Sequence, residues 1–80
     1  MRLDKYLKVS RIIKRRTVAN EVCDAARVTV NGKTAKAGYE VKQGDNIEIR
    51  FGEKRNAFLV LFTDERSAKA ENSPMYKVLE

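Results

Sequence analysis

The sequence predicts an α+β fold, with two N-terminal helices packed on a small, mainly antiparallel β-sheet. Apolar residues recur at helical spacing as far as Ala26 and alternate with a period of two from Val28 onward. Where the period changes, Asn31-Gly32 is the residue pair that a tight type I′ hairpin requires. Helices followed by hairpin-linked strands are typical of an α+β domain.

The first helix is expected to bury Leu3, Tyr6 and Leu7, which share one face at helical spacing. Residues 9–14 then form a connector or a short helical turn, anchored by Ile12 and Ile13. Backbone N–H groups at the start of the next helix favour anions, because they carry the positive end of the helix dipole.

The second helix is expected to begin after Thr17, whose hydroxyl can cap the first free N–H groups. Its apolar stripe follows at i, i+4, i+7 and i+8: Val18, Val22, Ala25 and Ala26.

Five strands are expected in the rest of the chain. Residues 28–30 and 33–35 form the Asn31-Gly32 hairpin, and residues 46–51 form a third strand with Ile47, Ile49 and Phe51 on one face. Residues 57–62 are apolar on both faces, so residues 75–79 are expected to dock beside them as a last strand. Residues 63–73 form a loop or a short helix, limited by Pro74.

Eighty residues are expected to form one domain with a radius of gyration of about 12 Å. We expect residues 1–62 to form the binding domain, around a core of residues 2–51. Residues 63–80 are then a short C-terminal segment that docks on the same domain.

The composition excludes most familiar catalytic sites. The chain has no histidine and one cysteine, so it cannot assemble a Cys/His zinc site, a Ser-His-Asp triad or a Cys-His pair. We therefore expect no catalytic residue, no metal and no cofactor, and we assign Cys23 to the core. No apolar run approaches the roughly 20 residues that a membrane span needs, and we expect no signal peptide, because no apolar stretch follows the basic start. A cytoplasmic protein without a membrane partner is expected.

The whole net charge of +6 lies in the first sixteen residues, where seven Lys/Arg face one Asp. From Thr17 to Glu80, ten Lys/Arg and ten Asp/Glu cancel. A field concentrated on one edge attracts an extended polyanion, so nucleic acid is the expected partner. The six aromatic residues are not interleaved with arginines as a base-stacking platform requires, so recognition of RNA shape and backbone is expected.

The candidate RNA-binding residues comprise the basic segment, its acid, the helix cap and two lysines beside the hairpin: Arg2, Asp4, Lys8, Arg11, Lys14, Arg15, Arg16, Thr17, Lys33 and Lys36. Arginines suit this role because the planar guanidinium forks onto phosphate oxygens. Asp4 either orients Arg2 or Arg16 by an ion pair or simply favours a helix N-terminus. Lys33 and Lys36 either extend the basic surface or protect a strand edge.

Several motifs occur in one order along residues 2–51: Arg2-Leu3-Asp4 with Leu7, Arg16 before a helix containing Ala19, Val28-Thr29-Val30-Asn31-Gly32, then Lys36, Val41 and Gly44-Asp45. This order resembles the RNA-binding domain named after ribosomal small-subunit protein four, the alpha-L motif. The run from Lys5 to Thr17, the chain length and the Met75-Tyr76 ending are similar to the short ribosome-associated quality-control relatives of heat-shock protein fifteen.

The resemblance implies that Arg2 and Arg16 match recurrent family arginines and that Asp4 matches the acid of the first helix. It also implies three partners: ribosomal RNA of the large subunit, its peptidyl-tRNA after stalling, and a quality-control factor that adds C-terminal alanines to the trapped chain. Ala26 stands where relatives have the glycine that ends the second helix, so a left-handed backbone there would cost about 1 kcal/mol.

Two other functions remain open on the sequence. One is a protein-interaction adaptor that presents residues 75–79 as an open strand edge. The other is a general factor for ribosomal subunit assembly or rescue. In each case we expect a monomer in isolation.

Overall fold

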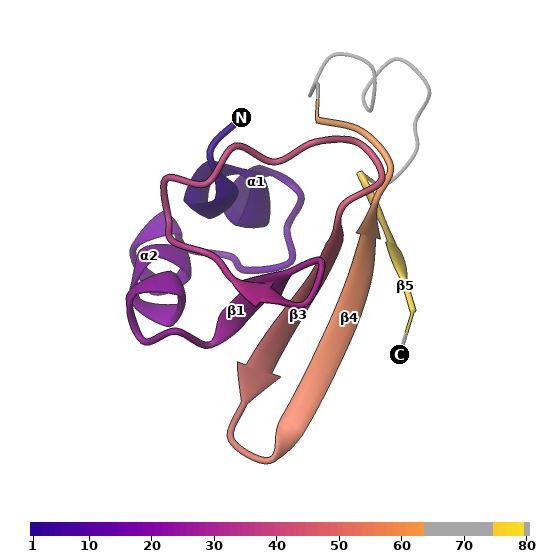
Figure 1. The fold of residues 1–80 in the computed structure, drawn as a ribbon. Coiled ribbons are helices and arrows are strands. Elements are labelled where there is room, and N and C mark those ends of the chain that lie inside the picture. Colours follow the sequence, from indigo (N-terminus) through magenta and orange to yellow (C-terminus); the bar gives the residue numbers. More distant parts are fainter. Residues whose placement is uncertain (64–74, 80) are drawn as a thin grey trace.

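The predicted α+β class is confirmed. The computed structural model describes residues 1–63 and 75–79, and Figure 1 shows two helices beside a twisted sheet. The helices are α1 (Leu3–Val9) and α2 (Arg16–Asp24). The strands are β1 (Val28–Val30), β2 (Lys33–Thr34), β3 (Asn46–Phe51), β4 (Lys54–Val60) and β5 (Tyr76–Val78). All neighbours in the sheet order β2-β1-β3-β4-β5 pair antiparallel. The radius of gyration is 11.5 Å.

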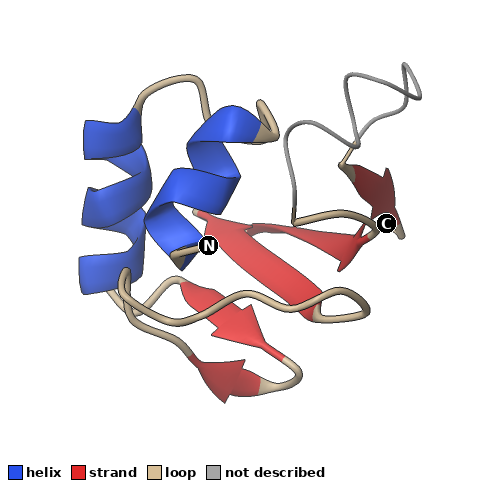
Figure 2. Ribbon diagram, turned by 90° about the horizontal axis from the view of Figure 1, so that it is seen from above, coloured by secondary structure: helices blue, strands red, loops and turns tan. Residues whose placement is uncertain are grey.

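Both helices pack against one side of the sheet (Figure 2). The expected face of α1 is confirmed, because Leu3, Tyr6 and Leu7 have no exposed surface. Ile47 and Ile49 of β3 are equally buried and belong to the same apolar cluster. Side chains of a strand alternate between faces, so the intervening residues of β3 lie on the side without helices.

The segment after α1 is a connector and not a helical turn. Ser10 caps the helix, and its hydroxyl donates to the Leu7 carbonyl at 3.3 Å. Arg11 then adopts a left-handed backbone with φ of 68°, and the Ile13 N–H donates to the same Leu7 carbonyl at 2.9 Å. This ending turns the chain back along α1, and the buried Ile13 anchors it.

The expected start of the second helix is wrong by two residues. Arg15 is the N-cap, with an extended backbone, and Thr17 lies inside the first turn, where it caps nothing. The apolar stripe is also displaced: Ala19, Val22 and Cys23 are buried, whereas Val18 is 37% exposed. Ala19, Val22 and Cys23 lie at i, i+3 and i+4, and this stripe packs into the apolar cluster with α1 and the sheet in place of the stripe through Val18.

The helix also ends earlier than the stripe predicted. Its last residue is Asp24, and Ala25 is the C-cap. Ala26 follows with φ of 59°, the left-handed conformation that the missing glycine would have adopted without strain. Ala25 and Ala26 are therefore exposed and contribute nothing to the core.

The Asn31-Gly32 hairpin is confirmed, with the two positive φ values, 53° and 84°, that a type I′ turn needs. The returning strand stops at Thr34, one residue short of the prediction. Strand β4 begins at Lys54 and ends at Val60, displaced from the expected 57–62, because Phe51 and Lys54 close a two-residue turn. That hairpin extends beyond the helices, so Phe51 is 41% exposed although it shares the face of Ile49.

The expected last strand is confirmed as β5, which pairs with β4 through Phe58↔Val78 and Val60↔Tyr76. The Phe58 and Tyr76 rings meet edge to face, with centroids 5.3 Å apart. Met75 is buried, and its carbonyl accepts a hydrogen bond of 2.8 Å from the Tyr6 hydroxyl of α1. The loop or helix expected over 63–73 lies outside the described residues, except for Thr63, and the boundary at residue 62 stays a prediction.

Candidate nucleic-acid interface

Asp4 joins the first turns of the two helices. Its side chain is 4% exposed, and its carboxylate lies between two guanidinium groups: Arg2 Nε is 3.3 Å from Oδ1, and Arg16 Nε is 3.5 Å from Oδ2. The two arginine side chains remain 55% and 50% exposed. The sequence allowed Asp4 to pair with one arginine or the other, and the structure pairs it with both.

Two further donors complete the surroundings of this carboxylate. The Lys5 N–H donates to Oδ1 at 2.8 Å, and the Asn20 side-chain amide donates to Oδ2 at 3.5 Å. Burial by itself would raise the pKa of Asp4. The hydrogen bonds from Lys5 and Asn20 and the charges of Arg16 and Arg2 outweigh burial together, so the pKa lies below its ordinary value. Asp4 is therefore ionised at neutral pH and holds both arginines.

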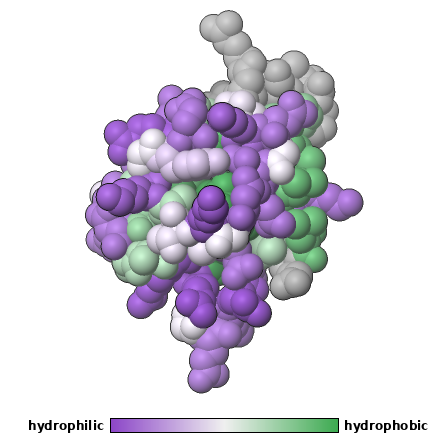
Figure 3. All heavy atoms as spheres, viewed as in Figure 1, coloured by the Kyte–Doolittle hydropathy of each residue, from purple (hydrophilic) through white to green (hydrophobic). Residues whose placement is uncertain are grey.

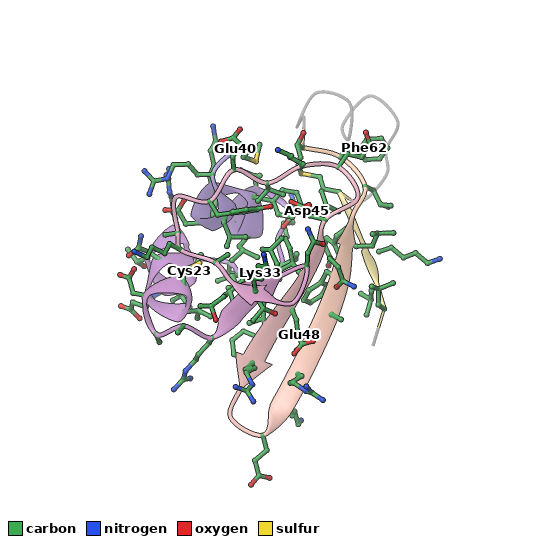
Figure 4. All side chains as sticks on the ribbon, viewed as in Figure 1. Cys23, Lys33, Glu40, Asp45, Glu48 and Phe62 are labelled. Atoms are coloured by element: carbon green, nitrogen blue, oxygen red, sulfur yellow. The ribbon has the colours of Figure 1, made fainter. Side chains whose placement is uncertain are left out.

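The loop that follows β2 closes over the start of α1. The Leu3 N–H donates to the Tyr39 carbonyl at 2.8 Å, and the Asp4 N–H donates to the Ala37 carbonyl at 3.1 Å. The α-amino group of Met1 pairs with Glu40 at 2.6 Å, which lowers the pKa of that carboxyl (Figure 4). The first N–H groups of α1 thus donate hydrogen bonds to carbonyls of this loop. The loop also brings the backbone of Lys36 to the same end of the helix.

The structure brings some of the predicted residues together and leaves others apart. Arg2, Asp4 and Arg16 form one cluster, with Arg15 next to it as the N-cap of α2. Lys8 and Arg11 lie at the opposite, C-terminal end of α1, and Lys14 lies on the connector. All these basic side chains, together with Thr17, are exposed. The cluster therefore brings together three of the predicted residues at the first turns of both helices, and Lys8 and Arg11 lie apart from it at the other end of α1.

Lys33 lies on the hairpin, beside a network centred on the buried Asp45 (Figure 4). The Asp45 carboxylate accepts hydrogen bonds from the Asn31 amide at 3.1 Å and the Tyr39 hydroxyl at 3.0 Å. Burial and then the Asp45 bond raise the pKa of Tyr39. Lys33, Asn31 and Tyr39 line a shallow hollow that is open to solvent. The network fixes the hairpin against the loop that covers α1.

Sequence reasoning missed Asn20 and Glu40. Asn20 follows Arg16 by four residues, so both occupy one face of α2, and this spacing was a signal that could have identified it. Glu40 is brought to Met1 by an isolated bridge between residues 2 and 40, which no local pattern predicts. Within residues 1–63 and 75–79, no group of His, Cys, Asp or Glu could hold a metal ion, and no helix is long and apolar enough to cross a membrane.

Comparison with known proteins gives the same family as the motif order. Residues 1–47 match the S4 domain family. The chain is 55% identical over 78 residues to an RQC P-site tRNA stabilizing factor of Halalkalibacterium halodurans, covering 98% of this chain and 89% of that protein. It is 49% identical to the protein of the same name in Bacillus subtilis, over 100% of this chain and 93% of that one. Among solved structures, the trimeric heat shock protein 15 of Vibrio cholerae superposes with a TM-score of 0.80 at 28% identity, covering 98% of this chain and 80% of the other.

Proposed function

The chain belongs to the S4 domain family and, within it, to the RQC P-site tRNA stabilizing factors, and from this membership we propose a non-catalytic role on stalled ribosomes. The protein binds RNA of a large ribosomal subunit that still carries peptidyl-tRNA, and it holds that tRNA in the P site. It thereby supports the factor that adds C-terminal alanines to the trapped chain. This role places the protein in the cytoplasm with the ribosomes.

The buried Asp4 between Arg2 and Arg16 is the observation that carries this proposal. Each arginine faces Asp4 with its Nε, at 3.3 and 3.5 Å, which leaves the terminal amino groups of the guanidinium to fork onto phosphate. An arginine that is already oriented loses less conformational entropy on binding. The cluster therefore presents two oriented guanidinium groups at the start of both helices.

The remaining predicted residues add charge around this cluster. Arg15 and Lys14 precede α2, Lys8 lies in the last turn of α1 and Arg11 follows it, and Lys36 lies on the loop over α1. Lys33, on the hairpin, extends the basic surface to a second stretch of the RNA backbone. Contacts of this kind read the shape and phosphates of RNA and not its bases.

The test measures binding to purified large subunits that carry peptidyl-tRNA, at several salt concentrations. If about five phosphates are engaged, log affinity falls with log salt at a slope of roughly −3.5 to −4.5. The double variant Arg2→Ala/Arg16→Ala is expected to bind at least about tenfold more weakly, with a slope reduced by about 1.5. It should also abolish alanine tailing in a reconstituted reaction.

A matched control removes two cations from strands that lie away from the cluster, in Lys54→Ala/Lys77→Ala. Because the change in net charge is the same, this variant reports the effect of charge alone. Equal affinities for the two double variants would contradict the proposed interface.

The adaptor remains a second candidate because β5 leaves an apolar patch at the sheet edge (Figure 3). Val78 is 57% exposed and Leu79 is 43% exposed. In that case Val78→Ser/Leu79→Ser would abolish the complex, and nuclease treatment would leave it intact. These positions are preferable to a deletion, because the buried Met75 ties the segment to Tyr6.

A further inference from the structure

Three arginines that are distant in sequence form a row across neighbouring strands. Arg50 of β3 lies directly opposite Arg55 of β4. On the other side, the Arg50 N–H donates to the Arg27 carbonyl at 2.9 Å, one residue beyond the β1–β3 pair Val28↔Ile49. Adjacent strands are about 4.8 Å apart, so the three residues follow one another at about that spacing.

The row lies on the side of the sheet without helices. Ile49 and Phe58 are buried in the core that the helices cover. Because side chains alternate along a strand, Arg50 lies on the opposite face from Ile49, and directly opposed residues share a face. Arg27 and Arg50 are exposed, and the Arg55 side chain is 61% exposed.

Little negative charge accompanies the row. Glu48 shares its face and pairs with Arg55 at 3.6 Å (Figure 4). Among the described residues, no ion pair is formed by Arg27 or Arg50. Glu53 and Lys54 at the hairpin turn cancel each other, and Figure 3 shows hydrophilic side chains over this projecting hairpin. Like charges on directly opposed residues destabilise a sheet, so the row opposes folding unless an anion binds it.

We propose that Arg27, Arg50 and Arg55 form a second contact with the RNA phosphate backbone, on the face of the sheet away from the helices. The inference rests on the proposed function in taking RNA as the partner, and it adds a surface to it. Regularly spaced guanidinium groups fit a chain of regularly spaced phosphates. The apolar residues that share this face, Leu59 and Leu79, lie further along β4 and β5, so the row itself offers guanidinium groups to phosphate and no apolar anchor to a protein partner.

This row and the Asp4 cluster occupy opposite ends of α2. Arg16 begins the helix and Arg27 follows its end, and nine helical residues alone span about 13 Å. One phosphate cannot reach both ends. The two surfaces therefore contact different stretches of RNA, which fixes the orientation of the protein on its target.

The test is the variant Arg50→Gln, measured by affinity and salt slope on large subunits that carry peptidyl-tRNA. We expect binding about three- to tenfold weaker and a slope reduced by 0.7 to 0.9, as loss of one phosphate contact predicts. Adding Arg27→Gln should double the change in slope. The matched control is Lys54→Gln, which removes the same charge from the same hairpin but from the face of Phe51.

Two more measurements complete the design. The melting temperature of Arg50→Gln should equal or exceed that of the wild-type protein, because relief of the opposed charges stabilises the sheet. A photo-crosslinker on Arg50→Cys should attach to ribosomal RNA, whereas one on Lys54→Cys should not. Crosslinks from position 50 to protein alone, or equal affinities for Arg50→Gln and Lys54→Gln, would overturn the proposal. Neither result would affect the Arg2/Arg16 test, so the two proposals can fail independently.

Discussion

The substitution Asp4→Asn separates orientation of the arginines from attraction by net charge. Asparagine has nearly the same size as aspartate, but it turns an amide N–H₂ toward a site that already contains two guanidinium groups and the Lys5 N–H. The new N–H₂ group is a buried donor without an acceptor, which costs about 1 to 3 kcal/mol, and we expect a loss of about 2 kcal/mol in the free energy of unfolding at neutral pH. With a urea m-value of roughly 1 kcal/mol/M, the denaturation midpoint falls by about 2 M.

The pH dependence of this difference follows from the lowered pKa of Asp4. A carboxyl whose pKa is lower in the folded state than its ordinary 3.8 contributes stability above that value, and loses it as the pH falls through the folded pKa. The gap between wild type and Asp4→Asn should be constant well above pH 3.8 and should shrink as the pH falls below that value. Equal urea midpoints at pH 7, or a gap that persists in acid, would refute the role of the ionised carboxylate.

RNA binding gives the sharper result. Asp4→Asn raises the net charge by one above +6, so attraction by charge alone predicts tighter binding. If Asp4 orients Arg2 and Arg16, binding to large subunits instead weakens, although the slope against salt changes little. A binding titration at one salt concentration shows whether the variant binds more tightly or more weakly than the wild-type protein. Tighter binding would refute the orienting role.

Three further substitutions or measurements test the fold. Ala26→Gly relieves the positive φ and should raise the melting temperature by about 5 °C, for about 1 kcal/mol, as followed by circular dichroism. Tyr6→Phe removes one of three donors to the Met75 carbonyl, which also accepts from the Leu61 and Phe62 N–H groups, and should lower the free energy of unfolding by about 0.5 to 1.5 kcal/mol in urea titrations; an unchanged midpoint would contradict this bond. Burial, helped by nearby carboxylates, raises the pKa of Cys23 to about 11, so a thiol reagent at pH 8 should react slowly until urea unfolds the chain; rapid reaction of the native protein would contradict this burial.

Elements governed by local spacing were predicted well from the sequence. The face of α1 and the Asn31-Gly32 hairpin depend on neighbours a few residues away, and both are confirmed. The errors came from features that depend on distant partners. The face that α2 buries depends on how the helix packs against α1 and the sheet, and the exposure of Phe51 follows from how far the helices extend over the sheet.

The candidate site shows the same division. The basic segment and the importance of Asp4 were visible from charge counts, yet its simultaneous pairing with Arg2 and Arg16 depends on how the connector returns the chain. The arginine row was hidden for another reason. Residues 17–80 carry no net charge, so charge counts do not indicate a basic surface there. Only the strand register shows that Arg27, Arg50 and Arg55 are adjacent.

The two arginine groups achieve order by different means, and this difference has a functional consequence. Asp4 fixes Arg2 and Arg16 by ion pairs, at the expense of one unit of positive charge. The row is fixed by the sheet itself, because opposed strand positions set the spacing of its members without a buried acid. Phosphates carry no sequence information, so neither group alone identifies an RNA. Two rigid groups at opposite ends of one helix, however, require phosphates at a defined separation, and that separation is a property of RNA shape.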